Sequence, residues 1–182
     1  MMLSKHTVLF DQPLETIFKA IQSLPPEYKW GEGMLYADTS MRSPDEVGTT
    51  NLILRNADVV IEEYTETLVE LDAPYKLALS LTLDDFAMSR NIPKGHALPD
   101  AADLSRARAR IADGRATNLL FALTLTQRAP QTEASLTIAN AGQTAPKLGS
   151  GLFKRVLPNP AKTLLDWLVT EMDGPVPTSS SE

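Results

Sequence analysis

Residues 75–84 read YKLALSLTLD, and this stretch decides the fold class. Leu77, Leu79, Leu81 and Leu83 alternate with smaller or polar residues, which is the period of two expected for a half-buried antiparallel strand. Each leucine gains roughly 2 kcal/mol on full burial. A strand of this kind therefore needs a covering layer.

Strand patterns continue on both sides of this segment. Residues 6–10, 34–38, 47–54, 117–127 and 132–139 read as further strands. Residues 59–71 alternate for longer, and three glutamates, at 62, 66 and 70, share one face with Tyr64. Because glutamates usually face water, we expect that face to be exposed and the other face, which carries Ile61 and Glu63, to point inward.

Helices are predicted at both ends of the chain. The first begins near Pro13, and it buries the apolar positions 14, 17, 18 and 21. A second apolar stripe covers residues 148–157 and ends at Pro158. Asn159 then caps a helix that ends at Gly174 and has apolar residues at 161, 164, 165, 168, 169 and 172. This amphipathic helix needs an apolar surface, which the alternating strands supply.

Residues 85–115 lack the alternation of apolar and polar residues that marks the strands on either side. A helix over 100–112, capped by Asp100 and ended by Gly114, is favoured. The alternative is a hairpin in which 105–112 is a strand and 113–114 its turn. We interpret the segment as an insertion or lid, and we expect it to gate a cavity and to be the most mobile ordered part of the chain.

Composition favours a globular protein and excludes several classes. The 182 residues are expected to form one domain over 1–174, with 175–182 as a disordered tail. The net charge of −6 argues against nucleic acid as a partner. The absence of cysteine removes disulfides, thiolate catalysis and cysteine-bound zinc. We expect no signal peptide, no integral membrane segment and a cytoplasmic location, and the oligomeric state stays open.

Motifs for metals and cofactors are missing from the sequence. The two histidines, His6 and His96, have no second histidine at ligand spacing. The glycines around Glu32 and Ser150 form neither a dinucleotide loop nor a nucleophile elbow, and there is no phosphate-binding loop. We therefore expect neither a metal nor a cofactor.

One segment carries a resemblance to a known family. Residues 8–18, VLFDQPLETIF, combine an apolar strand, Pro13, Glu15 and the pair Ile17 and Phe18. With Trp30 and the segments 132–138 and 151–155, this order resembles the helix-grip fold of the START-like or SRPBCC superfamily. That superfamily includes polyketide cyclase-like proteins, lipid-transfer domains and the birch-pollen allergens. The resemblance implies a single α+β domain, in which a curved antiparallel sheet wraps on a C-terminal amphipathic helix and encloses an apolar cavity.

Glu63 is the candidate catalytic residue. A carboxylate on the inward face of a cavity can act as a general acid or base, whereas a local bulge would turn it to solvent. The candidate ligand-binding residues are Trp30, Ile61, Leu79, Leu81, Phe121, Leu123, Phe153 and Trp167. For the aromatic ones among them, a place in a plain core is the alternative and the commoner role. Arg106, Arg108, Arg110 and Arg115 either meet an anionic head group or form a solvated face.

Three functions follow from this sequence. The leading hypothesis is the binding or carriage of a hydrophobic small molecule or lipid in an internal apolar cavity. The alternatives are a cyclase, dehydratase or isomerase that uses Glu63, and a chaperone-associated protein-interaction module. The predicted core consists of Leu77, Leu79, Leu81, Phe121, Leu123, Leu136, Leu164, Leu165 and Leu168.

Overall fold

The computed structural model describes residues 2–38, 45–57, 59–90, 94–95, 98–113, 118–140 and 160–173. Within these ranges the strands are β1 (Met2–Phe10), β2 (Met34–Tyr36), β3 (Thr50–Ala57), β4 (Val60–Asp72), β5 (Lys76–Met88), β6 (Asn118–Arg128) and β7 (Gln131–Asn140). They form one seven-stranded sheet in the order β1-β7-β6-β5-β4-β3-β2, and every neighbouring pair is antiparallel. The described residues thus confirm the predicted α+β class.

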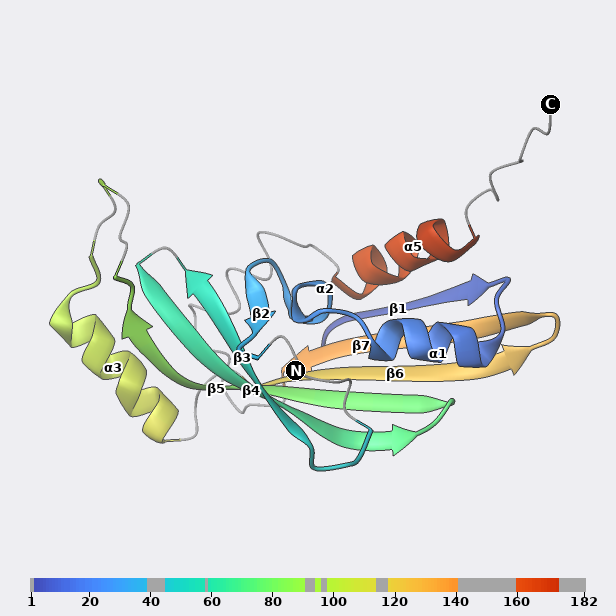
Figure 1. Ribbon diagram of the computed structural model, residues 1–182, viewed down its shortest axis with the longest axis horizontal. Coiled ribbons are helices and arrows are strands. Elements are labelled where there is room, and N and C mark those ends of the chain that lie inside the picture. Colours follow the sequence, from blue (N-terminus) through green and yellow to red (C-terminus); the bar gives the residue numbers. More distant parts are fainter. Residues whose placement is uncertain are drawn as a thin grey trace.

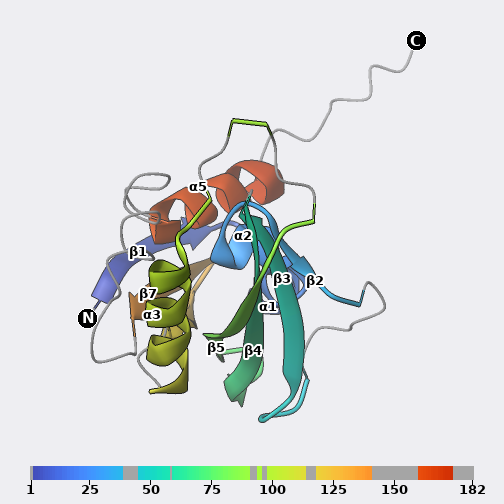
Figure 2. The same ribbon diagram turned by 90° about the vertical axis from the view of Figure 1, so that its left-hand side faces the viewer.

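The described helices are α1 (Leu14–Gln22), α2 (Pro26–Trp30), α3 (Ala101–Ala112) and α5 (Pro160–Asp173). Helix α5 packs along β1 and β7, α1 packs against β6 and α2 against β2 (Figure 1). Helix α3 stands apart from these three (Figure 1) and contacts β5; Figure 2 views the molecule from the end that carries α3. In the described ranges, no helix has both the length and the apolar composition of a membrane span.

The core lies between the sheet and the layer formed by α1, α2 and α5. All nine residues predicted for the core are buried, with exposed fractions between 0 and 5 %. Phe10 from β1 and the α1 residues Ile17 and Ile21 complete it, each at 0 % exposure. The leucines of residues 75–84 therefore meet the covering layer that their period required.

Segment 85–115 is partly corrected by the structure. Its helix is confirmed over its predicted length, because α3 begins after Asp100, whose side chain accepts a hydrogen bond from the Asp103 N–H at 2.6 Å. The strand that was expected to end at residue 84 is longer, because β5 continues to Met88. Helix α2 was not expected. The stripe at 148–157 and the tail at 175–182 lie outside the described residues.

Two bulges change which side chains of β4 and β5 face the core. In β4 the side chains of Tyr64, Glu66 and Leu68 point inward. The register shifts at Val69, so that the next inward side chain is Leu71, which pairs with Leu77. A second shift in the same strand pair falls at Asp84 in β5. A one-residue shift moves every later side chain to the opposite face, so a single alternation cannot describe either strand.

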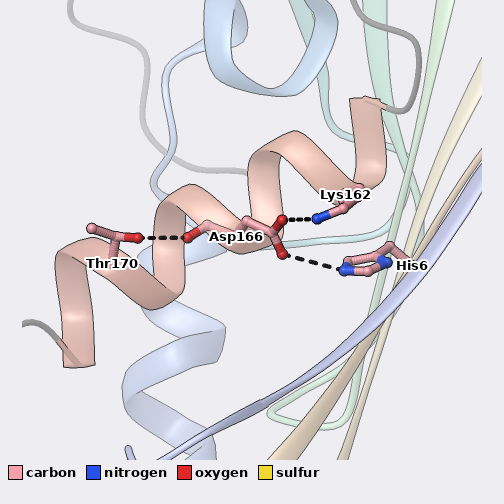
Figure 3. Close-up of polar contacts among 4 residues, drawn as sticks. All are labelled: His6, Lys162, Asp166 and Thr170. Carbon is pink, nitrogen blue, oxygen red and sulfur yellow. Dashed lines mark hydrogen bonds and ion pairs between the residues drawn. The ribbon is translucent and has the colours of Figure 1, made fainter.

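Helix α5 is tied to β1 by polar contacts along its length. The Ala161 N–H donates to the buried Ser4 hydroxyl at 3.1 Å. One turn on, the Asp166 carboxylate accepts from Lys162 and lies 3.3 Å from His6 Nε2 (Figure 3). The hydrogen bond from Lys162 lowers the pKa of the Asp166 carboxyl. These contacts hold α5 in the place from which it forms a wall of the site described next.

Candidate functional site

A groove of about 270 Å³ lies between α2 and α5. Its walls are largely apolar or aromatic and consist of Glu27, Tyr28, Lys29, Trp30, Gly31, Pro160, Thr163, Leu164 and Trp167. Tyr28 and Trp167 stack across it, with ring centroids 4.7 Å apart and planes 24° from parallel. Both tryptophans of the chain line this groove.

Local sequence explains how α2 reaches this position. Pro25 and Pro26 end the run from α1 and start a new short helix, since proline is favoured in a first helical turn. Gly31 follows α2 with a φ of 124°, a backbone conformation that favours glycine. The chain can therefore turn sharply into β2 and leave Lys29 and Trp30 against the sheet.

Beneath the groove, the carboxylate of Glu66 is 1 % exposed and fully partnered. It accepts hydrogen bonds from Trp30 Nε1 at 2.5 Å, Tyr36 Oη at 3.1 Å and Asn51 Nδ2 at 3.3 Å. Lys29 Nζ lies 3.7 Å from Glu66 Oε2, and both side chains of this ion pair are wholly buried. Donors from α2, β2 and β3 thus converge on one residue of β4, and we call these five residues the Glu66 network.

Burial dominates the electrostatics of the Glu66 network. It lowers the pKa of Lys29, and the Glu66 carboxylate opposes that shift. Burial also raises the pKa of the Tyr36 phenol, with a further contribution from Glu66. Tyr36 is therefore a hydrogen-bond donor at neutral pH, and it donates to Glu66 while lying 3.3 Å from Lys29 Nζ.

The chemistry open to Glu66 follows from its partners. The Glu66 carboxylate accepts three hydrogen bonds, lies beside the Lys29 cation and is buried away from solvent. It is poorly suited to exchange protons with a substrate. The Glu66 network is better suited to fixing α2 on the sheet, which makes the floor of the groove rigid.

A second polar cluster lies further along the same face of β4. Glu62 Oε2 accepts hydrogen bonds from Tyr64 Oη at 2.8 Å and from Arg55 Nη1 at 3.1 Å. Burial raises the pKa of the Tyr64 phenol, with Glu62 adding to the shift. In the neighbouring strand β5, the ring of Phe86 lies beneath Arg108, whose guanidinium carbon is 5.3 Å from the ring centroid. Within the described residues, no group of three His, Cys, Asp or Glu side chains is arranged to hold a metal ion.

Glu63 does not occupy the predicted inward position. The inward face at this point of β4 is the one that carries Tyr64 and Glu66, so the face assignment was wrong. Glu63 is only partly buried and pairs in register with Leu54 and Asp85. The three glutamates suggested a wet face, but the partners of Glu62 and Glu66 compensate the cost of burying their charges.

The predicted ligand residues separate into groups. Trp30 and Trp167 line the groove, and Phe121 touches Trp30 edge to face at 5.9 Å. Leu79, Leu81, Phe121 and Leu123 are at most 2 % exposed and fill the core. Ile61 is partly exposed, on the face opposite Glu66. Phe153 lies outside the described residues.

The arginine cluster lies on solvent-exposed α3, which contributes no buried residue. Arg106 pairs with Asp103 on the same helix, Arg108 lies over Phe86, and Arg110 is exposed. Arg115 and His96 lie outside the described residues. Of the two readings of this cluster, the solvated face fits Arg106 and Arg110.

Sequence reasoning missed Lys29 and Glu66. The available signal was the spacing of Tyr64, Glu66 and Leu68, which places one carboxylate between two large apolar residues on one strand face. Lys29, beside Trp30 after two prolines, carried no signal of its own, because its role depends on how α2 docks on the sheet.

Comparison with solved structures shows a shared α+β fold. No protein-family model and no curated protein sequence matches this chain. Among solved structures, it is similar to protein CV1439 from Chromobacterium violaceum, at a TM-score of 0.52 and 14 % identity over 94 % of this chain and 96 % of that one. It is also similar to a protein from Arthrobacter aurescens, at a TM-score of 0.54 and 11 % sequence identity. That match covers 98 % of this chain and 91 % of the other. The match to DynU16, from the dynemicin biosynthetic locus, has a TM-score of 0.46 and 12 % sequence identity. It covers 93 % of this chain and 48 % of DynU16.

Proposed function

We propose that this protein binds a hydrophobic small molecule in the groove between α2 and α5. The observation that carries the proposal is the aromatic lining of this groove, which Tyr28, Trp30 and Trp167 surround. The buried residues Lys29 and Glu66 form an ion pair with each other, so neither leaves an uncompensated charge near the groove. Aromatic walls with few polar groups are typical of small-molecule sites. The helix-grip fold that the sequence resembles implies a cavity between the sheet and the last helix. In this structure Leu79, Leu81, Phe121 and Leu123 fill the core there, and the proposed site is the groove between α2 and α5 instead.

The size of the groove restricts the ligand. Its volume of about 270 Å³ is close to the lower limit of small-molecule pockets, which is about 300 Å³. A compact molecule of one to three rings, or a short acyl chain, fits this space better than a complete lipid. Because polar lining is sparse, desolvation of the ligand supplies most of the affinity, and binding should have a negative heat-capacity change.

The enzymatic alternative has less support. Glu63 is partly buried and lies beside Asp85 in the register, away from the groove. Glu66 is saturated with donors, as described above. An acid–base role would require a carboxylate that touches both the ligand and a proton-exchanging partner, and neither residue meets this condition. The alternative of a protein-interaction module predicts no small ligand at all, so one experiment separates it from the proposal.

Native mass spectrometry of freshly purified protein provides that experiment. We expect an apolar molecule to co-purify with the wild type and to be lost in Thr163→Phe, because this exposed wall residue would fill the groove with an aromatic ring. Thr170→Phe is the matched control, since Thr170 is exposed on the same helix but does not line the groove. Equal occupancy in the two variants would place the ligand elsewhere, and no ligand in any form of the protein would favour the interaction module.

A further inference from the structure

Tyr28 and Trp167 close part of the groove by stacking on each other. Their ring centroids are 4.7 Å apart and their planes are 24° from parallel, which leaves no room for a third ring between them. The two side chains are held differently. Trp167 is partly buried and packs against the core, whereas Tyr28 is 44 % exposed and its hydroxyl has no hydrogen-bond partner among the described residues. Tyr28 is therefore the partner in this stack that can move.

The helices that carry the two rings are both fixed to the sheet. The Glu66 network holds α2, and the contacts with Ser4 and His6 hold α5. A third ring between Tyr28 and Trp167 would push their centroids far beyond the present 4.7 Å, because each stacked pair needs about 4.5 Å or more. A rotation of the exposed Tyr28 side chain, in contrast, frees the face of Trp167 without moving either helix.

We propose that the groove takes a flat aromatic ligand, whose ring displaces Tyr28 and stacks on Trp167 in its place. This inference rests on the proposed function and names the class of molecule that the groove binds. The stack in the free protein shows that this face of Trp167 accepts an aromatic ring. Trp30 and Leu164 supply apolar walls for the rest of the ligand. A saturated ring system or an acyl chain has no flat π face, so it gains from desolvation but not from stacking.

Removal of the Tyr28 ring should strengthen the binding of a flat ligand. The ligand has to break the stack between Tyr28 and Trp167 before it can bind, and Tyr28→Ala removes that cost. A stacked aromatic pair changes an equilibrium constant by roughly two- to tenfold. Tyr28→Ala should therefore bind a flat ligand tighter than the wild type by about this factor. If Tyr28 were a fixed wall of the groove, the same change would weaken binding.

Calorimetric titration with 2-naphthol and decahydro-2-naphthol tests the proposal. The two alcohols share a carbon skeleton and a hydroxyl group, but only 2-naphthol is flat, and the saturated alcohol has at least as much apolar surface to bury. We expect the wild type to bind 2-naphthol about two- to tenfold more tightly than the saturated alcohol, and Tyr28→Ala to bind 2-naphthol more tightly still. Tyr75→Ala is the matched control, because Tyr75 is 51 % exposed and does not line the groove. It should leave both affinities unchanged.

NMR spectra of the wild type give a readout that needs no variant. Saturation with 2-naphthol should release the ring protons of Tyr28 from the ring-current shift that Trp167 causes. Weaker binding of 2-naphthol to Tyr28→Ala, tighter binding of the saturated alcohol to the wild type, or Tyr28 resonances that stay in place would each overturn the displacement. Binding that Thr163→Phe still weakens would then leave the proposed function standing. If neither alcohol binds to the wild type or to Tyr28→Ala, both the displacement and the proposed function fail.

Discussion

Replacing Lys29 by methionine tests the most consequential contact of the structure. The change keeps the length and the apolar stem of the side chain but removes the cation 3.7 Å from the Glu66 carboxylate. At an effective dielectric of about 20, a pair at this distance attracts by roughly 4–5 kcal/mol. Removing one partner of a buried pair usually costs about 3–5 kcal/mol, because the other charge stays buried without compensation. We expect Lys29→Met to lower the free energy of unfolding by an amount in this range.

An exposed ion pair in the same sheet provides the control. Lys76 Nζ lies 3.6 Å from Glu70 Oε1, almost the same separation, but these side chains are 50 % and 57 % exposed. Lys76→Met should cost about 1 kcal/mol or less, because water screens exposed pairs. Urea unfolding of both variants, followed by far-UV circular dichroism, measures the two losses.

The comparison has a clear refuting outcome. Equal losses for the two lysine variants, within about 0.5 kcal/mol, would show that Lys29 and Glu66 are not a buried pair. The double variant Lys29→Met/Glu66→Gln should be more stable than Lys29→Met alone, because it leaves no buried charge. The single amide oxygen of the glutamine can keep the hydrogen bonds from Tyr36 and Asn51, which both go to Oε1, or the one from Trp30, which goes to Oε2.

Three further predictions concern other parts of the chain. Leu79→Ala and Leu165→Ala should each lower the free energy of unfolding by roughly 2–5 kcal/mol in urea titrations, since both side chains are 0 % exposed, and losses under about 0.5 kcal/mol at both would contradict the core. Asp100→Ala should destabilise α3 locally by about 0.5–2 kcal/mol, seen as faster amide hydrogen exchange in that helix and unchanged exchange in β6. For Asp166 the folded pKa is lowered, so its contribution to stability is present above the ordinary value of 3.8 and is lost as the pH falls through the lowered one. The difference in urea midpoint between wild type and Asp166→Asn should therefore shrink on acidification, and a difference that grows in acid would reverse this sign.

Local patterns predicted most of the fold because they report burial directly. The leucines of residues 75–84 and the apolar stripe of α5 have regular periods, and their inward faces were assigned correctly. Asp100 was identified as a helix cap from residue type and position alone. Such signals succeed where each residue's environment depends mainly on its own strand or helix.

The candidate site was beyond the same reasoning for two physical reasons. Bulges at Val69 and Asp84 shift the phase of β4 and β5, and nothing in a single alternation marks them. The burial of Glu66 depends on donors from three other elements, which only the tertiary fold brings together. Without those donors a buried carboxylate would be prohibitively costly, so assigning the glutamates to water was reasonable from sequence and wrong in the structure.

Titration with an uncharged apolar fluorophore tests ligand binding in the groove most directly. The only tryptophans, Trp30 and Trp167, both line the groove, so excitation of the protein should transfer energy to N-phenyl-1-naphthylamine bound there. We predict saturable transfer in the wild type and in Thr170→Phe, and at least about tenfold weaker binding in Thr163→Phe, as expected when roughly 1.4 kcal/mol of contact is lost. Identical binding curves for Thr163→Phe and Thr170→Phe, or no saturable transfer in the wild type, would contradict a ligand site between α2 and α5.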